Sequence, residues 1–355
     1  MSSRPRKLRS RKAGLPPGSL VHIGEIKTGA PAYGLIDFDE SGVVEDSANN
    51  ASALVARPRL RATRWANVYG AHDPAELSLI GQAFGLHPLV LEDILNNAQR
   101  QKIDAYEDYL YVVLHRYELA PGTLRLEHDQ ISLVVGRDYV LSVQERPSNT
   151  FEPIRQRLRS GHGNLRRGGA AMLAYSMLDA VVDSYFGVVE QLGDAAETLE
   201  NEILGNPRPE TLEGIHQFKR CVTRLRRNLY PLREVLNALH HDAGDFFPDD
   251  IQLYLRDVYD HAVHILESLE DLRDLASGLL DVYLSTVSHR VNLEVRTLTV
   301  VATIFMPATL IAGIFGMNFH SMPLLADDSG FSYAMALMGA IAVVMLLLFW
   351  RRRYV

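Results

Sequence analysis

Two long uncharged stretches near the C-terminal end constrain this chain more than any other feature. Neither Thr297–Ala326 nor Phe331–Trp350 contains an Asp, Glu, Lys or Arg residue. A helix of about 20 apolar residues crosses the hydrocarbon core of a bilayer, so each stretch can form one membrane span. The amide of Asn318 stands at the end of the first stretch, where it must face water or the inside of a helix bundle. The sequence therefore predicts a membrane protein with a polar site at the entrance of the membrane.

The rest of the chain has the composition of a soluble body attached to this anchor. With 355 residues it exceeds a typical single domain, and its formal net charge of −7 argues against nucleic acid as a partner. A single cysteine, Cys221, excludes a framework of disulfides within the chain. No nucleophile elbow, phosphate-binding loop or paired metal-binding motif is present, so we expect no enzyme activity.

Residues 15–165 are expected to form a cytoplasmic α/β domain. Apolar runs at Gly18–Gly24 and Ala32–Phe38, the alternation over Asp108–Leu119, and a hairpin-like turn at Gly136–Asp138 indicate strands. Helix-like segments cover residues 74–86 and 88–97, and Asp73 followed by Pro74 has the pattern of a helix start.

Strand signals end near residue 150, and long helices follow. We expect helices at Ala170–Leu204 and Glu210–His241, and one continuous helix over Ile251–Phe315. The last carries an apolar seam with heptad spacing, which indicates packing on other helices, often those of other subunits: Val258, Ala262, Ile265, Leu269, Leu272, Ala276, Leu279 and Tyr283. At 1.5 Å per residue this helix spans roughly 100 Å, so most of it must be a stalk outside the bilayer.

The expected boundaries follow from these patterns. They are a basic disordered tail (1–14), the α/β domain (15–165), a helical pair (166–248), the stalk (249–295), the first span (296–316), an outer loop (317–330), the second span (331–350) and a basic tail (351–355). Arg290 and Arg296 precede the first span and Arg351–Arg353 follow the second, whereas the loop has neither Lys nor Arg. The positive-inside rule therefore places both termini in the cytoplasm.

Two spans cannot enclose a pathway, so transport would require an oligomer. A helical stripe on the first span suggests what would line the path: Asp281, Ser285, Ser288, Asn292, Val295, Thr299, Ala302, Met306 and Thr309. The apolar side chains of Val295, Leu298 and Met306 would form a constriction that closes by dewetting. Ordinary packing between helices is the alternative reading of the same stripe, and periodicity alone favours it.

Oxygen-bearing residues suggest divalent-cation sites. Gly316 can adopt the left-handed conformation that ends a helix, and Asn318 would offer an amide oxygen to hydrated Mg²⁺. Further acids are Glu92 and Asp93, Asp179 and Asp183 one helical turn apart, and Asp257 and Asp260 with His261 and His264 at i,i+4 spacing. A solvated acidic surface is the alternative reading of these acids.

Several segments of the sequence resemble those of a known family. Thr299–Phe319 (TVVATIFMPATLIAGIFGMNF) is similar to the signature of the CorA family of divalent-cation channels. The basic end of the second span and four other segments resemble that family in order along nearly the whole chain: His87–Leu95, Tyr230–Leu236, Arg256–His261 and Ser277–Ser285.

The resemblance implies a funnel-shaped homopentamer in the inner membrane of a prokaryote, transporting Mg²⁺ and often Co²⁺ or Ni²⁺. It implies an α/β cytoplasmic domain, a long helical stalk and two transmembrane helices per subunit. The family's selectivity motif falls on Gly316, Met317 and Asn318, and its pore positions fall on Asp281, Asn292, Leu298, Thr299, Met306 and Thr309. Its regulatory Mg²⁺ sites between subunits fall on Glu92, Asp93, Asp179 and Asp257, where the bound ion holds the channel closed.

The chain departs from the family pattern in the outer loop. His320 and Leu324 stand where relatives often carry acids. Asp327 and Asp328 are the acids that would substitute for them in this chain. Val295 stands where relatives often carry Met. Zinc-transporting relatives typically carry Ile at the position of Met317. A zinc, cobalt or nickel transporter of the same fold, and a membrane-anchored metal sensor that conducts nothing, therefore remain as alternatives.

Overall fold

The computed structural model describes residues 14–242, 244, 246–317 and 329–352. The chain divides into two compact units. The first contains Met1–Leu199 and Glu213–Ser277, and the second contains Glu200–Leu212 and Gly278–Val355.

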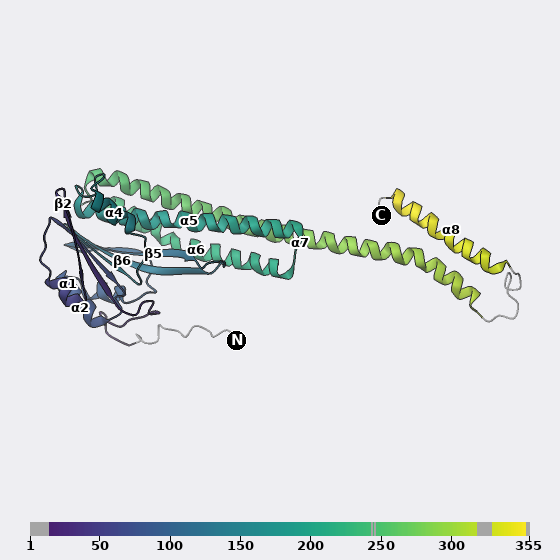
Figure 1. Cartoon of the computed structure of the whole chain (residues 1–355), viewed down its shortest axis with the longest axis horizontal. Helices are drawn as coiled ribbons and strands as arrows, with labels where there is room; N and C mark the ends of the chain where they lie inside the picture. Colours follow the sequence, from purple (N-terminus) through teal and green to yellow (C-terminus); the bar gives the residue numbers. More distant parts are fainter. Residues whose placement is uncertain (1–13, 243, 245, 318–328, 353–355) are drawn as a thin grey trace. The chain divides into compact units, whose positions relative to one another are not determined.

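The first unit is built on a mixed sheet of seven strands (Figure 1). The strands are β1 (Ala32–Asp39), β2 (Gly42–Ala48), β3 (Thr63–Tyr69), β4 (Lys102–Ala105), β5 (Tyr109–Leu119), β6 (Leu126–Gly136) and β7 (Tyr139–Gln144). Their order is β2-β1-β3-β7-β6-β5-β4, in which only β3 and β7 are parallel neighbours. The expected α/β class is confirmed.

Short helices cover one face of this sheet. They are α1 (Ala51–Ala56), α2 (Pro74–Ala83) and α3 (Pro88–Ile94), and their apolar residues share a core with Tyr109, Tyr111 and Val113 of β5. The expected helix start is confirmed, because the Asp73 side chain accepts a hydrogen bond of 2.8 Å from the backbone N–H of Ala75. On the other face, Trp65 packs edge-on against Phe151, just before α4 (Glu152–Ser160).

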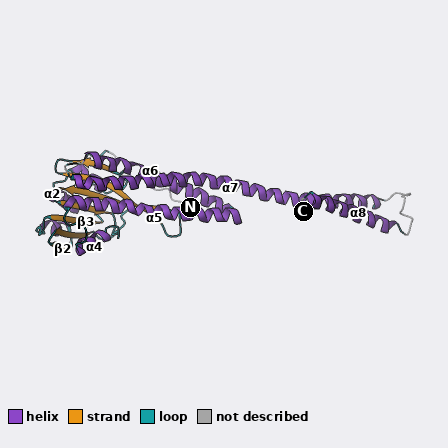
Figure 2. Cartoon of the chain, turned by 90° about the horizontal axis from the view of Figure 1, so that it is seen from above, coloured by secondary structure: helices purple, strands orange, loops and turns teal. Residues whose placement is uncertain are grey.

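Three long helices follow: α5 (Gly169–Gly205), α6 (Pro209–Asp242) and α7 (Asp249–Phe315). Figures 1 and 2 show α5, α6 and the first part of α7 side by side next to the sheet. Tyr185 of α5 donates a hydrogen bond to the carbonyl oxygen of His115 in β5, and Arg226 of α6 pairs with Glu270 of α7. These contacts join the helices to the sheet and to one another.

The heptad seam of α7 is buried inside a single chain. Val258, Ala262, Ile265, Leu269 and Ala276 are each at most 1% exposed. The expectation of helix packing is confirmed, but over this part of α7 the packing partners are α5 and α6 of the same chain. Spacing alone could not tell these helices from those of another subunit.

The second unit carries two strongly apolar helices, the end of α7 and α8 (Gly330–Arg351). Among the described residues three helices are long and apolar enough to cross a membrane, and α5 is the third. The apolar window of α5 is 56% buried within the chain, against 6% for α7 and 0% for α8. We therefore assign the two spans to α7 and α8, whose exposed apolar surface needs lipid or other helices around it.

Several sheet elements differ from the expectation. Gly18–Gly24 forms no strand, and only Ile23 makes an isolated bridge, to Asn96. Strands β2, β3 and β4 and helices α1 and α4 had no expected counterpart. They take their places through pairing with neighbouring strands, which a local pattern of apolar residues does not reveal.

Candidate functional site

A cluster of ionisable side chains lies between α5 and α7 in the first unit. The ligand atoms of Asp179, Asp183 and His261 lie within 4.8 Å of one another, and no other such group of three is present among the described residues. His261 Nδ1 lies 3.6 Å from Asp183 Oδ1, and His261 Nε2 lies 3.8 Å from Asp257 Oδ2. The fold thus brings Asp257 near Asp179 and Asp183 within one chain, through the ring of His261.

The acids of this cluster carry like charges close to one another. Burial raises the pKa of Asp179, and the negative charge of Asp183 raises it further. The His261 ring also packs edge-on against Phe186, with ring centres 5.6 Å apart. Carboxylate oxygens suit Mg²⁺, and an imidazole nitrogen widens the range to Co²⁺ and Ni²⁺. A divalent cation would remove the repulsion between the acids.

Sequence reasoning named Asp183 and His261 but did not place them among the site residues. Each stands one helical turn from a chosen residue, Asp183 from Asp179 and His261 from Asp257. That spacing was the available signal, and the packing of α7 on α5 turns two separate pairs into one group.

Glu92 and Asp93 lie outside this group, at the end of α3. Lys102 forms an ion pair with Asp93 at 2.7 Å, and Gln99 donates a 2.7 Å hydrogen bond to the same carboxylate. Glu92 accepts a hydrogen bond from the backbone N–H of Gly18. Burial opposes the charge of Lys102, but its hydrogen bonds to Asp104 and Asp93 outweigh burial and raise its pKa. Any cation at Asp93 must therefore share this carboxylate with a lysine.

All seven expected pore residues have exposed side chains in a single chain: Asp281, Asn292, Val295, Leu298, Thr299, Met306 and Thr309. Leu298 and Met306 are 69% and 70% exposed. The hydroxyl of Thr299 donates a 2.8 Å hydrogen bond to the carbonyl of Val295, which satisfies it within the helix. Ordinary packing within one chain therefore does not account for these residues.

The expected selectivity motif stands at the end of α7, which stops at Phe315. Gly316 donates a helix-type hydrogen bond of 2.9 Å to Ala312 and is not in the left-handed conformation, so that expectation was wrong. A Cβ at Gly316 would lie 3.1 Å from the carbonyl oxygen of Ala312, which is also the acceptor of this hydrogen bond. Met317 is 50% exposed. Asn318, His320, Leu324, Asp327 and Asp328 lie outside the described residues.

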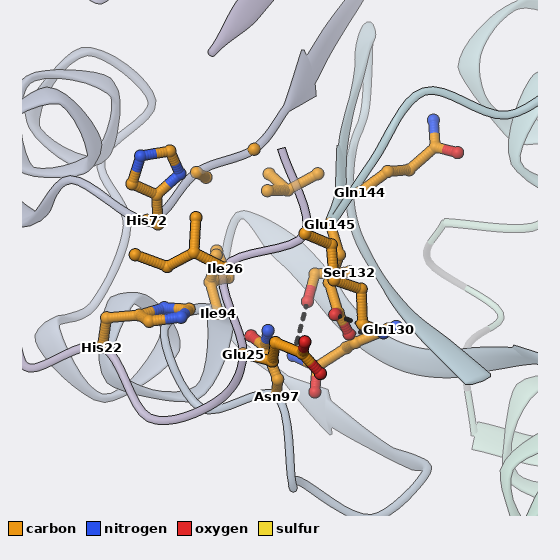
Figure 3. A pocket seen from close by; sticks show the side chains of 14 residues that line it. His22, Glu25, Ile26, His72, Ile94, Asn97, Gln130, Ser132, Gln144 and Glu145 are labelled. Atoms are coloured by element: carbon orange, nitrogen blue, oxygen red, sulfur yellow. Dashed lines mark hydrogen bonds and ion pairs between the residues drawn. The ribbon is translucent and has the colours of Figure 1, made fainter. Parts of the chain in front are cut away.

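A pocket that sequence reasoning missed lies under the segment before β1. Figure 3 shows His22 and His72 on one side of it and Gln130 and Glu145 on the other. Lys27 pairs with Glu145 at 2.7 Å, and burial followed by the nearby His72 lowers the pKa of His22. Glu25 also lines the pocket, but the acids and imidazoles there do not come close enough together to form a group of three metal ligands among the described residues.

Together, the fold, the two candidate spans and the cluster of metal-type ligands describe a membrane protein with side chains suited to divalent cations. Comparison with known proteins gives the family. The CorA-like Mg²⁺ transporter protein family matches residues 61–353, and this chain belongs to that family.

Individual relatives agree with this assignment. The cobalt/magnesium transport protein CorA of Thermotoga maritima is 41% identical over 349 residues, which cover 97% of this chain and 98% of that protein. The fold is similar to the solved CorA magnesium transporter of Methanocaldococcus jannaschii, with a TM-score of 0.74 and 20% identity over 92% of this chain and 99% of that one. It is also similar to the full-length CmaX protein, with a TM-score of 0.69 and 21% identity over 93% of this chain and 100% of that one.

Proposed function

We propose that this protein is a homopentameric channel that admits hydrated Mg²⁺, and also Co²⁺ or Ni²⁺, into the cytoplasm. The observation that carries the proposal is the 41% identity over 97% of the chain to a protein named for cobalt and magnesium transport. The two exposed apolar helices, α7 and α8, supply the spans that such a channel needs.

The pore would be formed by the first-span helices of five copies. One such helix leaves Leu298 and Met306 exposed, and a ring of five would turn them toward a shared axis. Apolar rings repel water and ions, so this part is proposed as the closed gate. Gly316, Met317 and Asn318 at the outer end are proposed to select the cation, with the Asn318 amide contacting its water shell.

Closure is proposed to depend on cytoplasmic Mg²⁺ bound between subunits. The ligands would be Glu92, Asp93, Asp179 and Asp257, and the structure adds Asp183 and His261 as neighbours of the last two. Burial and, after it, the charge of Asp183 raise the pKa of Asp179. An ion there would cancel the repulsion between the acids and would favour the assembled closed state by mass action.

The proposed setting is the inner membrane of a prokaryote, with both termini in the cytoplasm. Arg290 and Arg296 before the first span and Arg351 after the second support this orientation. The domain boundaries derived from the sequence, including the tails at 1–14 and 351–355 and the loop at 317–330, belong to the same proposal.

An ion-flux assay tests the function. Purified protein in liposomes should carry Mg²⁺ and Co²⁺. Mg²⁺ on the side of the membrane that holds the cytoplasmic domain should slow the flux. Preference for Zn²⁺ over Mg²⁺ would favour a zinc transporter of the same fold. No flux of Mg²⁺, Co²⁺, Ni²⁺ or Zn²⁺ from correctly assembled protein would favour a metal sensor. Chemical cross-linking in the same liposomes should give species of up to five subunits and none larger.

A further inference from the structure

A stripe of arginines on α6 faces a groove beside the sheet. Arg220, Arg224 and Arg227 follow i, i+4, i+7 spacing, so they share one face of the helix. All three are exposed, and none forms an ion pair with a carboxylate among the described residues. By contrast, Arg226 on the α7 side of the same helix is paired with Glu270. The stripe is therefore an uncompensated positive surface on a chain whose net charge is negative.

Two hollows lie along this stripe, where α6 runs beside β5 and β6 in Figure 1. The larger has a volume of about 600 Å³, and Arg100 and Arg227 are among the residues that line it. The smaller has a volume of about 280 Å³, and Arg125, Arg220 and Arg224 contribute to its lining. No Asp or Glu among the described residues lines either hollow. The groove therefore offers guanidinium groups that no acidic side chain along its lining neutralises.

The floor of the larger hollow carries a buried hydrogen-bond acceptor. Gln101 is 5% exposed, and its Nε2 donates a 2.8 Å hydrogen bond to the carbonyl of Asn228. Its Oε1 has no partner within the described part of the chain, although it is buried at the edge of the hollow. A buried oxygen without a donor costs free energy, so this atom is placed for a donor that arrives with a ligand.

The same floor is aromatic and neutral. His115 and Tyr117 are 5% and 3% exposed, and both line the larger hollow. Burial, together with the nearby charges of His128 and Lys27, lowers the pKa of His115 to about 3, so its imidazole is uncharged at neutral pH. The exposed ring of His128 completes the wall. His115 and Tyr117 pack beneath His128, with ring centres 5.5 Å and 6.1 Å away, so the exposed His128 ring is the surface on which a base can stack.

We propose that this groove binds a nucleoside phosphate. The phosphates would lie against Arg224 and Arg227, because guanidinium groups pair with phosphate through two parallel hydrogen bonds. The base would enter the larger hollow, with an exocyclic amino group donating to Gln101 Oε1. A hollow of this size suits one small molecule, and the buried floor favours it over the backbone of a long nucleic acid. This site is separate from the transport pathway and does not depend on it.

Calorimetry on the full-length protein in detergent and EDTA tests the proposal, with ATP and inorganic tripolyphosphate as probes. Wild-type protein should bind both, and ATP more tightly. The double variant Arg224→Ala with Arg227→Ala should weaken both by roughly tenfold or more, since each arginine provides charged hydrogen bonds. The matched control is Arg137→Ala, which removes an exposed arginine from the turn between β6 and β7 and should change neither.

The base contact has its own test. Gln101→Met should weaken ATP several-fold and leave tripolyphosphate unchanged, because only the base reaches this oxygen. Inosine triphosphate lacks the exocyclic amino group, so it should bind wild-type protein more weakly than ATP. This comparison uses no variant, so it tests the base contact even if Gln101→Met does not fold. Absence of ATP binding at millimolar concentration, or unchanged affinity in the double arginine variant, would refute the site. If a short RNA bound more tightly than ATP and displaced it, the groove would be a nucleic-acid site and the proposal would be refuted.

Discussion

Asp183→Asn should be more stable than the wild type in the absence of Mg²⁺ and less stable than the wild type in its presence. Asp183 and Asp179 carry like charges within 4.8 Å in the cluster with His261. At that distance two unit charges repel by roughly 1 kcal/mol in water and by about 3.5 kcal/mol at an effective dielectric constant of 20. Asp183 is 55% exposed, so the lower figure applies. In EDTA at pH 8, the variant should gain about 1 kcal/mol.

Mg²⁺ acts in the opposite direction. A ligand present at about 100 times its dissociation constant stabilises the folded state by roughly 2.7 kcal/mol. The wild type should gain this amount, while the variant, with one carboxylate fewer, should gain much less. Thermal unfolding of full-length protein in detergent measures both effects, and each kcal/mol corresponds to about 2–4 °C for a unit of this size.

The matched control is Asp194→Asn, which removes an exposed acid from the same helix but away from the cluster. It should respond to Mg²⁺ as the wild type does. The reasoning fails if Asp183→Asn is no more stable than the wild type in EDTA, or if both gain equally from Mg²⁺.

The pH dependence of the same comparison follows from the raised pKa of Asp179. A carboxyl group whose pKa is raised on folding favours the folded state at pH values below its unfolded pKa of about 3.9. This contribution to stability is lost as the pH rises through the folded pKa. In EDTA, acidification from neutral pH should therefore stabilise the wild type relative to Asp183→Asn, in which the repulsion is absent. A difference in unfolding temperature that stays constant down to pH 4 would count against charge repulsion as its cause.

Three further predictions concern the channel itself. Asn318→Ala should abolish selective Mg²⁺ uptake and leave the oligomer intact, so normal uptake by this variant would contradict its role in selection. Leu298→Asp should raise the leak at high Mg²⁺, because a wetted constriction loses its dewetting barrier; unchanged closed-state conductance would argue against this gate. Asp257→Lys should resist protease without Mg²⁺, because the ammonium would replace the charge of an ion proposed to lie between Asp257 of one subunit and Asp93 of a neighbouring one. Equal protection of the wild type with and without Mg²⁺ would remove Asp257 from the sensor.

The long helices could be predicted from sequence because their signal is local and repeated. The seam from Val258 to Ala276 has several turns of regular spacing, and breaks at Pro207–Pro209 separate α5 from α6. Strand β3 gave no comparable signal. Its residues Trp65, Ala66 and Val68 are all fully buried, but they are fixed by antiparallel pairing with β1 and parallel pairing with β7, both distant in sequence.

The candidate sites divide in the same way. Spacing on single helices identified the pairs Asp179 with Asp183 and Asp257 with His261, since residues one turn apart share a helix face. That the pairs meet depends on how α5 and α7 are rotated about their own axes, which no local pattern records. The arginine groove was missed for the same reason, because Gln101 and His115 come from segments far from α6 in the sequence.

The packing of the three helices therefore determines both charged surfaces at once. Burial of Phe218, Val222 and Leu225 on α6 fixes its rotation and leaves the arginine stripe toward the sheet. Burial of Val258 and Ala262 on α7 fixes that helix in turn and directs Asp257 and His261 to the acidic cluster on α5. One residue corresponds to about 100° of helix rotation, so a shift of a single position in either seam would point these charges elsewhere. The apolar seams thus hold the acids and the arginines on separate faces, as the proposed cation site and the proposed phosphate site both require.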